Sequence, residues 1–294
     1  MGIDCGIISR GIGECDASYE SRKIWHEFKE TAIFESRFFV KHRLLDILAD
    51  YMKSHVINIE QGTEFYRARI IDVSARSDLM MYKCYLAPDD QRLDINYAGR
   101  ANLFKGLSKE ASFVPPREVK VKGGRANPDY IRYLYVSEDP TTAIFEVRPL
   151  INDDVNLAKI LVNQSLRIAN IPVGVSLRHD DNAPLNLHVM AMIQGAFAKP
   201  TNDRDDYIPT QVIAEYLKSL GYDGIRFKSS LHYGGVNLTI FNYQKCEAIS
   251  SQHFRVEGTK LSARALIGSF NEKGDLFKIV DNDPKYLEVG LYSS

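Results

Sequence analysis

Apolar positions between Tyr19 and His55 recur at helix-like intervals among charged and polar side chains, with no Gly or Pro. This pattern predicts amphipathic helix, with a break near Glu35–Ser36 that divides it in two. The apolar positions are Ile24, Phe28, Phe38, Leu45, Leu48 and Met52. Two helices alone make a poor core, so we expect this stripe to pack on the rest of the chain or on a second copy. A homodimer through the stripe is the favoured expectation, and the alternative is that the helices dock beside a functional cleft and restrict entry to it.

Strand and helix signals alternate along the rest of the chain. Strand-like runs are EFYRARII, IRYLYVS, AKILVNQSLRIANI (one or two strands), DGIRFKS and VNLTIFN. Helix-like runs are TTAIFEVR, which follows the start signal Asp139–Pro140, LNLHVMAMIQGAFA, and TQVIAEYLKSL, which closes at Gly221. The stretch 72–124 is rich in turn residues, and no element is predicted there.

These elements predict an α+β protein with three parts. A helical appendage covers residues 1–60, a mixed-sheet domain covers 61–245, and a C-terminal extension covers 246–294. In the extension, LFKIV has strand composition.

Charge balance, cysteine content and the absence of common motifs exclude several classes of protein. The 294 residues include 37 Lys plus Arg and 38 Asp plus Glu, for a net charge of −1, so binding to nucleic acid or to a membrane surface is not expected. The four cysteines form no CxxC pair and no HExxH is present, so we expect no metal and a reducing compartment, the cytoplasm. The N-terminus lacks a secretory pattern, and no apolar run approaches the roughly 20 residues that span a bilayer. No P-loop or G-x-S-x-G motif is present.

Glu146 is a carboxylate among apolar neighbours on a short helix that is expected to be mostly buried. A buried carboxylate requires either a structural partner, such as an internal Arg, or a chemical purpose. Tyr135 lies on the strand that leads into this helix, and a tight turn between the two brings both side chains toward one cleft.

Three polar groups accompany them. Arg67 and Arg69 lie on one face of the strand in FYRAR. Guanidinium groups there either bind an anionic ligand or belong to the solvent-exposed face of an edge strand. In GGRAN, Arg125 and Asn127 follow two glycines, which permit close approach of a ligand but also occur in surface turns. The third group is the pair Ser229 and Ser230, at a strand end where serines are common.

Together these segments resemble the RES-domain family, named for its Arg, Glu and Ser. The matching segments are FYRAR, GGRAN, YLYVSEDPTTAIFE, GYDGIRFKSS and GGVNLTIF, in the family's order, and they span Glu64 to Tyr243. The resemblance implies a fold similar to that of ADP-ribosyltransferase toxins and an enzyme that consumes NAD as its substrate, with no separate cofactor. The implied reaction is cleavage of the nicotinamide–ribose bond by hydrolysis or by phosphorolysis, with inorganic phosphate as co-substrate in the latter, by a bacterial toxin or defence effector.

The resemblance also assigns roles. Glu146 stabilises the positive charge that develops on the ribose, in a transition state like that of glycoside hydrolysis. Tyr135 stacks on nicotinamide, and Ser229 hydrogen-bonds substrate near the reacting ribose, with Ser230 as the alternative. The pyrophosphate is held by Arg67 with Arg69 or Arg125. The polar side chains Asn127 and Asn237 are further candidates for binding substrate.

Two other functions remain open at this stage. ADP-ribose transfer onto a macromolecule uses the same site residues. Arg37 and His42 form an R-x4-H spacing that resembles helical HEPN ribonucleases, in which case the RES-like part is non-catalytic. Small members of the family pair with a helix-turn-helix antitoxin, which makes such a partner a further expectation.

Overall fold

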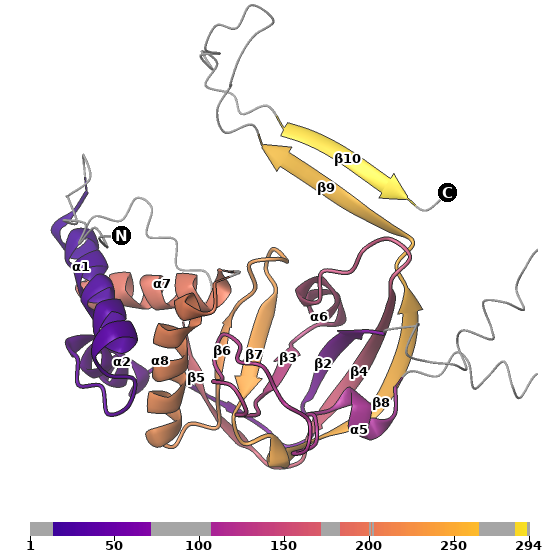
Figure 1. The fold of residues 1–294 in the computed structure, drawn as a ribbon, viewed down its shortest axis with the longest axis horizontal. Helices are drawn as coiled ribbons and strands as arrows, with labels where there is room; N and C mark the ends of the chain where they lie inside the picture. The colour runs from indigo at the N-terminus through magenta and orange to yellow at the C-terminus, as the bar shows by residue number, and fades with distance from the viewer. Residues whose placement is uncertain are drawn as a thin grey trace, which may run out of the picture.

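The computed structural model describes residues 14–71, 107–171, 183–199, 201, 203–264 and 286–292, with side chains up to residue 258. Its centre is an eight-stranded sheet with strand order β1-β5-β6-β7-β3-β2-β4-β8 (Figure 1). The strands are β1 (Val56–Ile59), β2 (Glu64–Ile70), β3 (Leu134–Ser137), β4 (Asp154–Val162), β5 (Leu166–Asn170), β6 (Gly224–Lys228), β7 (Val236–Ile240) and β8 (Cys246–Arg255). β5 and β6 are parallel, and every other neighbouring pair is antiparallel. The expected mixed sheet is confirmed.

The helices and short turns complete the α+β architecture. They are α1 (Asp16–Glu30), the π-helix η1 (Thr31–Glu35), α2 (Arg43–Met52), α5 (Lys109–Ser112), α6 (Pro140–Glu146), α7 (Leu185–Ala198), the 3-10 turn η3 (Asp205–Tyr207), α8 (Ile208–Ser219) and the 3-10 turn η4 (Tyr243–Lys245). The predicted break after Glu35 is present, because η1 ends there and α2 begins at Arg43. AKILVNQSLRIANI forms two strands, β4 and β5, which do not pair with each other.

The sheet separates two apolar cores, and β3 shows how alternation sorts side chains between them. Tyr133 and Tyr135 belong to the core formed with α1, α2, α7 and α8, which defines the helix face of the sheet. Leu134 and Val136 belong to the second core, against which Phe113, next to α5, packs. We call this second side the α5 face. The two-faced pattern expected for this strand is therefore confirmed.

The N-terminal helices dock on the chain's own domain. Ile24, Phe28, Leu45, Leu48 and Met52 are all buried in the core with α7 and α8, and in Figure 1 α1 and α2 lie against these helices. These five of the six stripe residues are therefore buried within one chain and are not available for the expected homodimer contact. Phe38 is the exception, since 79% of its surface is exposed.

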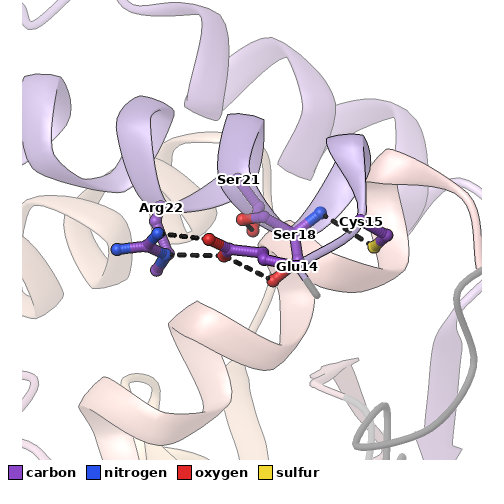
Figure 2. Close-up of polar contacts among 5 residues, drawn as sticks. All are labelled: Glu14, Cys15, Ser18, Ser21 and Arg22. Atoms are coloured by element: carbon purple, nitrogen blue, oxygen red, sulfur yellow. Dashed lines mark hydrogen bonds and ion pairs between the residues drawn. The ribbon is translucent and has the colours of Figure 1, made fainter. Parts of the chain in front are cut away.

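Polar contacts cap the N-terminal end of α1 (Figure 2). Cys15 Sγ accepts the Ser18 N–H at 3.4 Å, which is the role of a helix N-cap. Glu14 folds back to form an ion pair with Arg22 and accepts the Ser18 hydroxyl at 3.0 Å.

The expected boundaries at residues 60 and 245 do not separate independent units. β1 lies before the first boundary and pairs with β5, while β8 lies after the second and pairs with β4 along its length. Beyond β8, β9 (Gly258–Arg264) and β10 (Tyr286–Tyr292) form an antiparallel hairpin that extends away from the main sheet (Figure 1). The segment LFKIV and the N-terminal residues 1–13 lie outside the described residues.

Candidate functional site

A cleft of about 410 Å³ opens beside α6. Its walls come from β2, the GGRAN loop, β3, α6, η3, β6 and β7. Its polar and aromatic lining includes five side chains described below: Arg125, Tyr135, Glu146, Tyr207 and Asn237. Four of them are sequence-predicted site residues, and Tyr207 is an addition that only the fold brings here.

Glu146 is the last residue of α6, and one of its carboxylate oxygens accepts hydrogen bonds while the other accepts none from the described residues. Oε1 accepts the Ser229 hydroxyl at 2.7 Å and the Asn237 amide N–H at 2.7 Å. Within the described part of the chain, Oε2 has no hydrogen-bond partner and no Arg or Lys forms an ion pair with the carboxylate. The structural alternative from the sequence, an ion pair with an internal Arg, is therefore not what is found.

Each donor to Glu146 is itself held in place. Asn237 Oδ1 accepts the Ser137 hydroxyl at 2.7 Å, which directs its amide nitrogen at Glu146. Ser229 Oγ accepts the backbone N–H groups of Leu231 and His232 at 3.1 and 3.2 Å, which directs its proton at the carboxylate. The network therefore fixes the carboxylate in one orientation, and such preorganisation is what transition-state electrostatics require.

The local sequence explains why α6 delivers Glu146 to this point. Asp139 caps the helix by accepting the Thr142 N–H at 2.8 Å, and Pro140 occupies the first turn. Burial opposes ionisation of Asp139, but hydrogen bonds from Thr142 outweigh it and lower its pKa. The helix is less buried than expected, since Phe145 is 47% exposed.

Tyr135 presents its ring to the cleft while its hydroxyl is fully used. The hydroxyl donates to Asn127 Oδ1 at 2.6 Å and accepts the Ala126 N–H at 3.1 Å. Burial raises the pKa of this phenol to about 12, so it stays neutral at physiological pH. Tyr135 therefore presents an aromatic surface to the cleft rather than an exchangeable proton.

Asn127 acts within the GGRAN loop and not on the cleft. Its buried amide donates to the carbonyl oxygens of Ile131, Pro128 and Lys122, at 2.9, 3.2 and 3.4 Å. With both ends engaged, this side chain holds the loop against Tyr135. The structure does not bring the Asn127 amide to the lining of the cleft.

Arg125 is the guanidinium that the loop offers to the cleft. One of its nitrogens, Nη1, donates to the Phe197 carbonyl at 3.0 Å. The loop beneath it is clamped by Gln211 of α8, which donates to the Gly124 and Asn127 carbonyls at 2.8 and 3.2 Å. Gln211 is a residue that the sequence reasoning missed.

Arg67 and Arg69 lie on the other side of the sheet. Tyr66 pairs with Ser137 across β2 and β3, so Tyr66 is on the helix face, and alternation places Arg67 and Arg69 on the α5 face. Their guanidinium groups donate to the carbonyl oxygens of Ser112 and Ala111, respectively. Burial, with the nearby Arg69 charge, lowers the pKa of Arg67 to about 10, which still leaves it protonated at neutral pH. Arg67 borders the cleft, but its charged end points away from Glu146.

The two serines are clearly distinguished. Ser229 is buried and contacts Glu146, whereas Ser230 is exposed and donates to the Ala198 carbonyl at 2.7 Å. The structure therefore brings Ser229, and not Ser230, to the site.

A further group beside the site was not apparent from the sequence. The Thr142 hydroxyl donates to Asp139 and contacts His232 Nδ1 at 2.7 Å, while the His232 ring stacks on Phe145 with 5.3 Å between centroids. Because Thr142 gives its one proton to Asp139, the bond to His232 requires a proton on Nδ1. In the sequence, His232 lies in the loop HYGG between two predicted strands. That position does not reveal which residues the side chain contacts in the folded protein.

The R-x4-H pair does not form a site on one helix. Arg37 lies in the segment between η1 and α2, and His42 is the N-cap of α2, where Nδ1 accepts the Leu44 N–H at 3.1 Å. The helical setting expected from the resemblance is wrong, because η1 ends before Arg37 and α2 begins after His42.

Among the residues with described positions, no group of three or more His, Cys, Asp or Glu is arranged to hold a metal ion. The helices of the same residues include none long and apolar enough to span a membrane.

Comparison with known proteins shows which family the sequence matches. A family model described as RES domain matches residues 100–260, a range that includes Arg125, Tyr135, Glu146, Ser229 and Asn237 and begins after β2. A chain in the crystal structure of the M. tuberculosis MbcT–MbcA toxin–antitoxin complex is similar over 72% of this chain and 94% of its own, with 14% identity and a TM-score of 0.37. A search of curated proteins finds no match.

Proposed function

The chain belongs to the RES-domain family, and from this premise we propose that it degrades NAD by cleaving the nicotinamide–ribose bond. One observation carries the proposal: Glu146 is fixed through Oε1 by Ser229 and Asn237, and leaves Oε2 unengaged at the cleft. A carboxylate held in this way is suited to stabilise positive charge on a ribose ring.

The remaining lining residues support the same substrate. The Tyr135 ring offers a face to the cationic nicotinamide, and cations are attracted to aromatic faces. Arg125 offers a positive group for the pyrophosphate, which guanidinium groups bind well. This proposal assigns the pyrophosphate to Arg125, since Arg67 and Arg69 engage α5 on the opposite side of the sheet.

The reaction proceeds by loss of nicotinamide as a neutral base, which takes the electron pair of the broken C–N bond. Glu146 stabilises the oxocarbenium-like ribose, and either water or inorganic phosphate attacks the same carbon. Water gives ADP-ribose, and phosphate gives ADP-ribose 1″-phosphate. An acceptor on a macromolecule, in place of either, gives ADP-ribosyl transfer.

The test is incubation of purified protein with NAD, with and without phosphate, followed by chromatographic separation of products. Release of nicotinamide is expected. Protein that neither binds nor cleaves NAD under both conditions would exclude the proposal.

A toxin role follows as the biological part of this proposal. Expression in bacteria is expected to lower cellular NAD and arrest growth, and a helix-turn-helix antitoxin encoded beside it is expected to restore growth. Arrest with unchanged NAD would separate toxicity from the proposed reaction.

A further inference from the structure

A second hollow, separate from the cleft beside α6, lies between the segment that joins η1 to α2 and helix α8. It has a volume of about 640 Å³ and is mostly apolar, with Phe38, Phe39, Ile131 and Val212 among its walls. We call it the α8 groove. Its walls include side chains that a monomer leaves in water: Phe39 is 97% exposed and Phe38 is 79% exposed. Exposed apolar patches rimmed by polar groups mark interaction surfaces.

The backbone holds Phe39 outward. Phe39 has φ of 61°, in the left-handed region that bulky side chains rarely adopt. The segment follows the π-helix η1 and is tied by a hydrogen bond from the Ser36 hydroxyl to the Phe38 carbonyl. An exposed ring in a disfavoured conformation is a feature that chain folding alone does not explain.

Charge on the same surface is self-complementary. Arg37 and Glu215 both line the α8 groove and both are exposed. No ion pair engages Arg37 within the described ranges, whereas the Glu215 carboxylate accepts the Tyr133 hydroxyl from below. A two-fold axis that brings Arg37 of one copy against Glu215 of the other would repeat the contact with the roles exchanged.

We propose that the α8 groove is the contact surface for a second copy of this chain, in which each Phe39 enters the groove of the other copy. Ring and groove, cation and anion, occur together on one face of one chain, as an isologous two-fold contact requires. The aromatic residues and the Arg among the walls of the α8 groove agree with the composition of protein interfaces. Phe38 and Leu45 are the stripe residues that line this surface, and the other four stripe residues are buried within one chain. The proposed contact does not depend on the proposed enzymatic activity.

Analytical ultracentrifugation of the full chain tests the proposal. Wild-type protein is expected at twice the 33.4 kDa mass of one chain. Phe39→Asn is expected to be monomeric, and because Asn tolerates positive φ, this variant keeps the local backbone. Lys53→Glu, an exposed charge reversal at the end of α2, serves as the control and is expected to remain dimeric.

A charge exchange tests the specific pairing. Arg37→Glu and Glu215→Arg are each expected to give monomers, because they place like charges opposite each other, and the double variant is expected to recover the dimer. Thermal melting of each variant shows that it is folded. A monomeric wild-type protein, or a dimer that survives Phe39→Asn and both charge reversals, overturns the proposal. A double variant that stays monomeric overturns the Arg37–Glu215 contact.

Discussion

Ser229 donates a 2.7 Å hydrogen bond to Glu146 across 83 residues of sequence. This bond joins the loop between β6 and β7 to the end of α6, and Asn237 joins the same oxygen from β7. The carboxylate is therefore held by the β6–β7 hairpin, which lies beside α6 because β7 pairs with β3, the strand that leads into that helix.

Glu146→Gln is expected to fold normally and to lose most turnover. The Gln carbonyl oxygen still accepts from Ser229 and Asn237, but the charge at the cleft is gone. Loss of about 3 kcal/mol of transition-state stabilisation slows the reaction about a hundredfold. Steady-state rates of NAD cleavage, beside a thermal melt, provide the measurement. A variant with wild-type turnover would return Glu146 to a purely structural role.

Ser229→Ala and Ser230→Ala form a matched pair. Ser229→Ala removes one donor to Glu146 and leaves the Leu231 and His232 N–H groups without their acceptor, at a cost of about 1–3 kcal/mol in folding free energy. We expect lower stability and lower kcat for Ser229→Ala, and values near wild type for Ser230→Ala. Equal loss of turnover in both variants would contradict the assignment of Ser229.

Arg125→Ala is expected to weaken NAD binding, whereas Arg67→Ala is expected to lower stability. Loss of a charge-assisted contact to pyrophosphate, about 2 kcal/mol, raises KM for NAD about thirtyfold in Arg125→Ala. Arg67→Ala instead leaves the Ser112 carbonyl without its donor, so its unfolding midpoint in urea falls while KM stays unchanged. A large KM change in Arg67→Ala would mean that its guanidinium reaches the cleft.

Gly124→Ala is expected to impair substrate binding without a change in charge. A Cβ at Gly124 would lie 3.0 Å from Asn127 Oδ1 and 3.1 Å from the Tyr135 hydroxyl, so the GGRAN loop must shift by a few tenths of an ångström. We expect KM for NAD to rise about tenfold, since a 1 Å misplacement costs about a hundredfold. Gly195→Ala in α7 is the control, because nothing lies within 4 Å of its added Cβ. That substitution is expected to stabilise the protein by about 0.5–1 kcal/mol.

Asp223 is expected to make stability depend on acid pH. Burial opposes its ionisation, but the Arg167 N–H, Asn242 and Lys245 outweigh it and lower the pKa of Asp223 below its usual 3.8. A depressed pKa in the folded state contributes stability that is present above about pH 4 and is lost as pH falls through the folded value. Asp223→Asn is expected to cost about 2 kcal/mol at pH 7. Urea denaturation from pH 7 to pH 2 checks this, and a cost that does not shrink toward pH 2 would contradict it.

Most secondary structure was predictable because it depends on local signals. The Asp139–Pro140 start, the Gly221 stop and the alternation of Tyr133 to Val136 each act within a few residues, and all appear in the structure as expected. The grouping of Tyr135, Glu146, Ser229 and Asn237 was also anticipated, from the order of motifs that resemble a known family. Gln211, Tyr207 and Ser137 were missed because their importance comes from spatial neighbours alone.

The sequence by itself determined that Arg67 and Arg69 share one face of a strand, because side chains alternate along any strand. Only the tertiary structure decided which face that is. The pairing of Tyr66 with Ser137 turns both arginines toward α5 and away from Glu146. Likewise, the helical stripe had to be buried somewhere, but only the packing of α1 and α2 on α7 and α8 showed that it is buried within one chain. The periodicity of a helix or strand determines which of its side chains share a face. The register between elements determines which other residues that face contacts.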